Sequence, residues 1–168
     1  MQLLNEFKKL LFTLIEKKKE SYDRVLPLGD YFIDRWEKAK LLGFGEGTSV
    51  YDNVVVIGTV SVGNNTWIGP NVVLDGSGSL VIGANCSISA GVQIYSHDSV
   101  KWAVSGGRES YEYKNTIIGN NCYIGPNTVV SKGVILGDRC VVGANSFVNG
   151  SFPEGSKIAG SPARLIGK

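Results

Sequence analysis

A branched aliphatic residue recurs every six residues through most of this chain, and no other feature limits the possible folds as strongly. Val, Ile or Leu opens fourteen such hexads, and Gly follows directly in half of them. The first positions are Val50, Val56, Val62, Ile68, Leu74, Ile82, Ile88, Ile94, Ile118, Ile124, Val130, Leu136, Val142 and Val148. Self-similarity at a short fixed period predicts stacked structural repeats. The period breaks twice, with a slip of two residues after Leu74 and a longer interruption after Ile94.

The fifth position of each hexad is small or β-branched in nearly every repeat. Side chains alternate between the faces of a strand, so the first and fifth positions can both point inward if the chain turns a corner between hexads. Gly and Asn supply the positive φ angles that such corners need, as in 63–65, 83–85, 119–121 and 143–145. The apolar spacing of three and four that marks an amphipathic helix is absent from the repeats. The pattern therefore predicts an all-β protein, a parallel β-solenoid.

All three cysteines, Cys86, Cys122 and Cys140, occupy the fifth position. This placement favours small apolar residues in a stacked interior over a nucleophile or a metal ligand. Cys122 and Cys140 are three hexads apart, so a disulfide between them is an alternative. The odd number of cysteines fits a reducing compartment.

Charge and hydropathy exclude several classes of partner. The net charge of the whole chain is only +2, which implies neither a nucleic acid nor an anionic membrane as a partner. No segment resembles a transmembrane span. The first apolar run, Leu10 to Ile15, is too short for a secretory signal and has charged residues on both sides. We therefore expect a cytoplasmic protein without an integral membrane segment.

Residues 1–46 precede the repeats and show helical spacing instead. An apolar stripe runs along residues 2–19, and a run of three lysines, 17–19, suits the end of a helix. A second short helix is expected after Asp30 as N-cap, running to about Leu42. We interpret 1–46 as a helical cap that covers the first coil, with Trp36 and Phe44 as its aromatic core. The alternative is peripheral membrane attachment through the stripe and its lysines.

The repeats are expected over residues 47–166, interrupted by an excursion loop over about 98–115. The loop is rich in aromatic and charged residues, among them Trp102 and Arg108, and contains a Gly106-Gly107 hinge. Loops that leave a rigid scaffold are frequent sites of binding residues. We therefore expect Trp102 and Arg108 to contact a substrate.

His97 is the only histidine in the chain and stands where the coil opens into this loop. An imidazole can remove a proton from a hydroxyl group at neutral pH, so His97 is the candidate general base. One histidine per chain cannot supply a three-histidine zinc site, unless three subunits share one on a threefold axis. We therefore expect no metal requirement, and a carbonic-anhydrase-like function fails on the same count.

Three stretches carry a resemblance to a known family. The hexads IGNNCYIGPNTVVSKGVILGDRCVVGANSFV and the ending IAGSPARLIG, with a histidine and an excursion upstream, resemble the hexapeptide-repeat acyltransferases. Within that family the chain is similar to O-acetyltransferases of bacterial surface-polysaccharide biosynthesis. The segment DRWEKAKLLGFGEGTSVYD is similar to the N-terminal part of lipopolysaccharide-type O-acetyltransferases.

The resemblance implies a left-handed β-helix with three hexads per coil, a homotrimer, and acetyl-CoA in the groove between subunits. It implies direct transfer with His97 as the base that deprotonates an acceptor hydroxyl. It also implies a set of cofactor contacts: Tyr123, Gly125, Ala144, Asn149, Lys157, Ala159, Gly160, Pro162 and Arg164, with Lys168 as a further phosphate partner.

The chain departs from the family at Pro126, which lacks the backbone N–H that typically stabilises the oxyanion. Either the N–H of Gly125 or of Asn127 replaces it, or the pose of the reacting group shifts, so the oxyanion donor is open. Asn149-Gly150 stand where relatives often have Thr-Lys, which removes a basic contact to the cofactor.

A catalytic base needs a group that orients it, and Asp75 is the candidate. Leu74 to Ile94 is one coil plus the slip, so Asp75 is expected to stack near Tyr95, close to His97. Asp75 could instead bind the acceptor, as could Asn71, or could merely form the turn at the slip. Glu109 and Glu112 are weaker candidates because the path of their loop is not predicted.

The leading hypothesis is an acetyl-CoA-dependent O-acetyltransferase that acts on a sugar or saccharide. An amino-sugar N-acetyltransferase would use the same base, and a non-catalytic solenoid scaffold is the non-enzymatic alternative. A serine acetyltransferase is disfavoured by the short N-terminal helical part.

Overall fold

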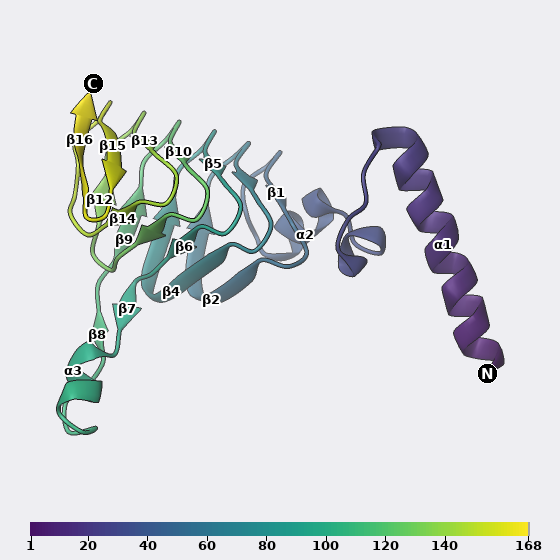
Figure 1. The fold of residues 1–168 in the computed structure, drawn as a ribbon, viewed down its shortest axis with the longest axis horizontal. Helices are drawn as coiled ribbons and strands as arrows, with labels where there is room; N and C mark the ends of the chain where they lie inside the picture. Colours follow the sequence, from purple (N-terminus) through teal and green to yellow (C-terminus); the bar gives the residue numbers. More distant parts are fainter. Residues whose placement is uncertain (168) are drawn as a thin grey trace.

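The computed structural model describes residues 1–167, so Lys168, expected above as a phosphate partner, lies outside the described residues. The chain forms a left-handed parallel β-helix, as predicted, with short strands stacked in successive coils and three helices outside the stack (Figure 1). The strands of the repeats are β1 (Ser49–Val50), β2 (Val55–Val62), β3 (Trp67–Ile68), β4 (Val73–Ile82), β5 (Ser87–Ile88), β6 (Gln93–Ile94), β9 (Thr116–Ile118), β10 (Tyr123–Ile124), β11 (Val129–Val130), β12 (Ile135–Leu136), β13 (Val141–Val142) and β14 (Phe147–Val148).

Each coil has three faces, and equivalent strands of neighbouring coils pair in parallel. The first face contains β1, β3, β5, β10 and β13, with β15 (Lys157–Gly160) and β16 (Ala163–Gly167) at its end. The second contains β6, β11 and β14, and the third contains β9 and β12. β2 and β4 run through the corner between the second and third faces and belong to both. Tyr123 pairs with Val141, eighteen residues later, which confirms three hexads per coil.

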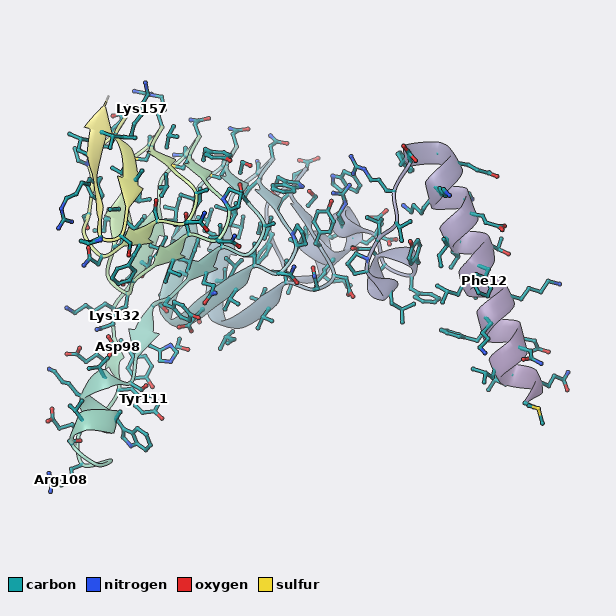
Figure 2. All side chains as sticks on the ribbon, in the orientation of Figure 1. Phe12, Asp98, Arg108, Tyr111, Lys132 and Lys157 are labelled. Atoms are coloured by element: carbon teal, nitrogen blue, oxygen red, sulfur yellow. The ribbon has the colours of Figure 1, made fainter. Side chains whose placement is uncertain are left out.

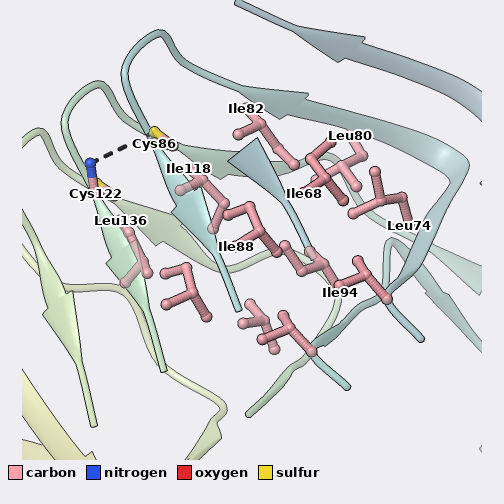
Figure 3. Packing of buried hydrophobic residues seen from close by; sticks show 14 of the residues in the cluster. Ile68, Leu74, Leu80, Ile82, Cys86, Ile88, Ile94, Ile118, Cys122 and Leu136 are labelled. Atoms are coloured by element: carbon pink, nitrogen blue, oxygen red, sulfur yellow. Dashed lines mark hydrogen bonds between the residues drawn. The ribbon is translucent and has the colours of Figure 1, made fainter. Parts of the chain in front are cut away.

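The interior consists of the hexad positions that the sequence identified. The first residues of the hexads from Ile68 onward are at most 1 % exposed, and Figure 3 shows how their side chains stack along the coil axis. Fifth-position residues such as Val72, Thr128 and Cys140 are equally buried. Burial of this aliphatic column is the main stabilising contribution to the fold.

The three cysteines are free and buried, which agrees with the structural interpretation rather than with a disulfide. The backbone N–H of Cys122 donates a hydrogen bond of 3.4 Å to Cys86 Sγ (dashed in Figure 3). Burial raises the pKa of the Cys140 thiol above its ordinary value. The cysteines therefore form a ladder of small side chains in successive coils.

The corners are built from Gly and Asn, as the sequence indicates. Asn65, Asn85, Asn121 and Asn145 all adopt left-handed backbone conformations, with φ between 54° and 59°. At Gly63 a Cβ atom would lie 2.6 Å from the backbone nitrogen of Ala84 in the next coil. The corner glycine thus allows the coils to approach each other, in addition to allowing the turn.

The two-residue slip is a bulge between β2 and β4. Gly58 pairs with Gly76, and Val60 then pairs with Leu80, so the longer strand carries two additional residues. Leu80 is fully buried and takes the interior position that strict counting assigns to Gly78. The slip therefore preserves the core.

The N-terminal region differs in part from the predicted cap. Helix α2 (Arg35–Leu41) and the 3₁₀ helix η1 (Leu28–Tyr31) lie against the first coil, with Ala39 and Phe44 buried there. The N-cap of α2 is Asp34 and not Asp30, because Asp34 accepts hydrogen bonds from the N–H groups of Trp36 and Glu37 in a capping box. Trp36 is 52 % exposed and stacks with Arg35, so it is not part of an aromatic core.

Helix α1 (Gln2–Tyr22) has no buried residue and extends away from the coils (Figure 1). It contacts η1, and Phe7 stacks on Phe32, the residue directly after η1, with 5.9 Å between ring centroids. The covering of the first coil therefore falls to η1 and α2, and α1 does not share it. None of the helices among residues 1–167 has the length and apolar character required to span a bilayer.

The excursion leaves the coil between the second and third faces. Its stem is an antiparallel pair, β7 (His97–Asp98) with β8 (Glu112–Tyr113), and its outer part contains the short helix α3 (Val100–Val104). Figure 1 shows it projecting from one side of the stack. At the C-terminus, β15 and β16 form an antiparallel hairpin that ends the first face.

Candidate active site

His97 begins the stem of the excursion and is held in place by the backbone of the coil. Ser96, directly before it, is fully buried; its hydroxyl donates to the carbonyl of Asp75 (2.7 Å) and accepts from the N–H of Gly78 (2.8 Å). On the returning arm, the N–H of Lys114 donates to the carbonyl of Ser96 (2.8 Å). The imidazole is 29 % exposed. A partly accessible side chain on a rigid support suits a group that must meet a substrate.

Asp75 contacts His97 directly. Asp75 Oδ2 is hydrogen-bonded to His97 Nδ1, while Oδ1 accepts from the N–H (2.9 Å) and hydroxyl (2.6 Å) of Ser77. Burial of Asp75 by itself would raise its pKa, but the hydrogen bonds from Ser77 and then His97 outweigh it and lower the pKa below the ordinary value. An ionised carboxylate at Nδ1 selects the tautomer that carries its proton there, which leaves Nε2 free to accept one.

The expected neighbourhood of Asp75 and His97 is therefore present. The other candidates for orienting His97 have different partners. Glu112 forms ion pairs with Lys101 and Lys132, and Glu109 is exposed, with its N–H bonded to the Ser105 hydroxyl. Asp75 is also not merely a turn residue, because it lies within strand β4.

Aromatic rings flank the imidazole on the excursion. Tyr113 stacks with His97 at 5.9 Å between centroids and 23° between planes, and Tyr111 does so at 6.3 Å and 27°. Trp102 packs edge-on against Tyr111 at 5.6 Å. Trp102, predicted as a substrate contact, thus belongs to the same aromatic cluster as His97.

A groove of about 380 Å³ opens beside His97. It is lined by His97 and residues 98–100 at the start of the excursion and by coil residues, namely Tyr95, Val129, Ser131, Lys132 and Phe147. Figure 2 shows Asp98 and Lys132 at the base of the excursion and Arg108 at its far end. Arg108 is exposed and does not line this groove.

Asn71 does not reach the groove either. Its Oδ1 accepts a hydrogen bond from Asn53 Nδ2 (2.6 Å), and its N–H donates to Asn53 Oδ1 (3.2 Å). Asn71 has a φ of 58° and belongs to the corner between the first and second faces. The positive φ required at that corner therefore explains the asparagine.

The residues expected to bind the cofactor lie elsewhere on the same chain. Tyr123 is 43 % exposed on the first face, and Lys157 is exposed one coil beyond Val141 on that face. Gly125 and Ala144 are in the corner between the first and second faces, Asn149 is exposed after β14, and Ala159, Gly160, Pro162 and Arg164 belong to the C-terminal hairpin. None of them lines the groove beside His97.

The corner at Gly125 is tightly packed, and the two candidate oxyanion donors beside it are already hydrogen-bonded. A Cβ atom at Gly125 would lie 2.6 Å from the nitrogen of Ala144, so stacking of the coils already requires glycine there. The N–H of Gly125 donates to Val142 (2.9 Å) and that of Asn127 to Ala90 (3.0 Å). Neither N–H is free to replace the one that Pro126 lacks.

Sequence reasoning missed Lys132, which forms ion pairs with Asp98 and Glu112 while its side chain is only 14 % exposed. The signal was present, because Ile94 and Val130 pair in neighbouring coils, and the same offset puts Lys132 level with Ser96. Among residues 1–167 no group of three or more His, Cys, Asp or Glu side chains is arranged to hold a metal ion.

Comparison with known proteins agrees with this architecture. Residues 115–150 match the family model for the bacterial transferase hexapeptide (six repeats), and residues 59–96 match that for the hexapeptide repeat of succinyl-transferase. A hexapeptide-repeat-containing acetyltransferase of Vibrio cholerae, solved with acetyl coenzyme A, is 28 % identical with a TM-score of 0.70. That match covers 96 % of this chain and 87 % of the other.

Two more distant structures share the fold. AntD, an N-acyltransferase of Bacillus cereus solved with dTDP and coenzyme A, is 20 % identical with a TM-score of 0.67, over 74 % of this chain and 71 % of that one. The acetyltransferase domain of PglB from Neisseria gonorrhoeae, solved with acetyl coenzyme A, is 20 % identical with a TM-score of 0.59, over 73 % of this chain and 50 % of that one. The two family models thus find hexapeptide repeats of bacterial transferases in residues 59–96 and 115–150, and the Vibrio acetyltransferase shares the fold over nearly the whole chain.

Proposed function

We propose that the protein transfers an acetyl group from acetyl-CoA to a hydroxyl of a sugar, as a step in surface-polysaccharide or lipopolysaccharide biosynthesis. The observation that carries this proposal is the contact between His97 and the buried Asp75 at the edge of an open groove. The resemblance of the chain to lipopolysaccharide-type O-acetyltransferases supports the choice of acceptor.

His97 acts as the general base and Asp75 positions it. His97 Nε2 takes the proton of the acceptor hydroxyl as its oxygen attacks the thioester carbonyl. The tetrahedral intermediate then collapses, the C–S bond breaks, and the imidazolium returns the proton to the sulfur of coenzyme A. Asp75 stabilises the imidazolium in between. No acyl-enzyme forms in this sequence, and no metal takes part.

The active enzyme is a homotrimer in this proposal. His97 faces a groove beside the second face, whereas Tyr123 and Lys157 lie on the first face. If both sets act in one site, two copies of the chain must contribute to it. We propose a closed ring of three copies in which the second face of one copy lies next to the first face of the next.

Within that intersubunit groove the nine cofactor residues hold acetyl-CoA. Tyr123, exposed on its flat face, contacts the pantetheine arm. Arg164 and Lys157 pair with phosphate groups, since both are exposed cations near the C-terminal hairpin. Trp102 and the tyrosines beside His97 receive the acceptor sugar. The reduced, buried thiols suit a cytoplasmic enzyme.

Amino-sugar N-acetylation is the second candidate. It is favoured by the structural likeness to AntD, an N-acyltransferase that has also been solved with dTDP-4-amino-4,6-dideoxyglucose. The base and the groove would serve an amine equally well, so the acceptor distinguishes the two reactions.

The test is release of free thiol from acetyl-CoA by the purified protein, over a panel of sugars, nucleotide sugars and amino sugars. We expect release only with an acceptor, and a loss of about 10²–10⁴-fold in His97→Ala, as for removal of a general base. The circular dichroism spectrum of His97→Ala should match that of the wild type. Full activity of this variant would exclude His97 as the base, and the best acceptor decides between O- and N-transfer.

A further inference from the structure

Lys132 occupies a position that the proposed chemistry does not explain. It follows β11 on the coil and reaches across to both strands of the excursion stem, where it pairs with Asp98 Oδ2 and with Glu112 Oε2 (3.0 Å). Asp98 and Glu112 are themselves a register pair between β7 and β8. One ammonium group therefore joins the rigid coil to both arms of the stem.

This contact differs from an ordinary surface ion pair. The Lys132 side chain is 14 % exposed, compared with 67 % and 54 % for the partners of the Arg139–Glu154 pair. Exposed pairs contribute little, because solvent screens them and two mobile side chains must be ordered. Lys132 contacts two carboxylates from a largely covered position, so solvent screening and the ordering of its side chain cancel less of the stabilisation.

The same group controls the charge beside the candidate base. Asp98 is the next residue after His97, and Lys132 lines the groove together with both. The hydrogen bond from Lys132 is the main cause that lowers the pKa of Asp98, with the charge of His97 as a smaller one. The hydrogen bonds to Asp98 and Glu112 raise the pKa of Lys132 above its ordinary value, so it stays charged.

We propose that Lys132 is a positioning residue that anchors the excursion stem to the coil and neutralises the carboxylate next to His97. The proposal rests on the role of His97 as base given above. Without Lys132, Asp98 and Glu112 would keep only Lys101, which pairs with Glu112 from a 56 % exposed position. Asp98 would then be an unpaired anion beside the imidazole, and it would favour the protonated form that cannot act as a base.

The titratable groups around His97 come from several elements. They are Asp75 from β4, Tyr95 after β6, Asp98 from β7, Tyr111, Glu112 and Tyr113 from the returning arm, and Lys132 after β11. Two cations belong to this cluster, Lys132 and Lys101, which pairs with Glu112, and of these Lys132 lines the groove with His97. Removal of Lys132 therefore lowers the net charge around His97 by one unit.

Because His97 is the only histidine, its titration can be followed by NMR in a protein without a histidine tag, with no assignment needed. We expect the His97 titration midpoint in Lys132→Met to move upward by about 0.5–1 pH unit relative to the wild type. Lys132→Arg should restore the wild-type midpoint. Asp98→Asn, which removes the anion instead of the cation, should not raise it.

Activity gives the second readout. The acidic limb of the kcat/KM profile against pH should move upward with the NMR midpoint in Lys132→Met. At pH 7 we expect kcat to fall about 10–100-fold, the range expected when a reacting group is displaced by about 1 Å. Trypsin should also cleave the excursion of this variant faster at Arg108, since its stem is released.

Arg139→Met is the matched control, because it breaks another ion pair between coils at an exposed corner. Its midpoint and cleavage rate should equal those of the wild type. If Lys132→Met matches Arg139→Met in both, the proposal is overturned. The titration midpoint and the cleavage rate do not depend on turnover. They therefore test the role of Lys132 even if His97→Ala stays active and His97 is not the base.

Discussion

At the scale of single residues, Asp75 combines two properties that rarely coexist. It is fully buried, and its carboxylate is nevertheless satisfied by Ser77, by His97 and by the N–H of Ser96 (3.4 Å). A buried carboxylate without such donors would be neutral. Here the hydrogen bonds keep it charged, and the charge orients the imidazole.

Asp75 should therefore make the stability of the protein depend on acid. Because its pKa is lowered in the folded state, its contribution is present above the ordinary value of 3.8 and is lost as pH falls through the lower folded value. We expect the difference in urea midpoint between the wild type and Asp75→Asn to be largest near pH 7 and to shrink below about pH 4. A difference that is constant from pH 7 to pH 3 would contradict this.

At the scale of the elements, each two-residue strand depends on its neighbours in the stack. Val142 on β13 is fully buried between coils, while Val141 beside it is 39 % exposed. The strand has too few residues to be stable alone, so its position is determined by pairing with β10 and β15. The alternation of side chains along the strand separates interior from surface within a single step.

Val142→Asp should therefore unfold the protein, because it places an unpaired charge between coils at a cost of about 3–5 kcal/mol. Val141→Asp, on the same strand, should retain a folded β-helix. Circular dichroism and thermal melting compare the two variants directly. A folded Val142→Asp protein that melts like Val141→Asp would show that the hexad assignment is wrong.

At the scale of the whole molecule, a single chain separates the two halves of the proposed site. The groove at His97 lies beside the second face, and the corner with Ala144 lies between the first and second faces. If the homotrimer joins them, each active site combines residues from two copies. Two variants that are each inactive should then complement each other in mixed trimers.

Mixed trimers of His97→Ala and Ala144→Trp should regain activity. Ala144 is exposed, so Trp there should block the cofactor groove without disturbing the coil. Each variant alone should be inactive. In randomly mixed trimers, however, about a quarter of the sites combine a wild-type His97 from one copy with a wild-type Ala144 from the neighbouring copy. The measurement is thiol release after co-expression of the two chains. No recovery in verified mixed trimers would mean that each site lies within one chain.

The periodic part of the protein could be predicted because its order is local and repetitive. Once the first hexad positions are known, stacking places every equivalent residue in the next coil, which is why the burial of Val142 and the neighbourhood of Asp75 and His97 followed from counting. The corner asparagines followed in the same way from their need for positive φ. The resemblance to the family added the handedness and the reaction class.

Only the tertiary structure decided the parts that do not repeat. The path of the excursion depends on the pairing of β7 with β8 across fourteen residues, from Asp98 to Glu112, and no period reports that pairing. The stacking of Tyr111 and Tyr113 on His97 and the double ion pair of Lys132 follow from that path. Helix α1 has an apolar stripe that suggested packing on the coil, yet amphipathicity states only that a face can be buried and not against what. Contacts between segments without a common repeat depend on the whole fold. The sequence alone therefore determined the coil, its single histidine and the nearby Asp75, but not the stacked tyrosines and the ion pairs around the histidine.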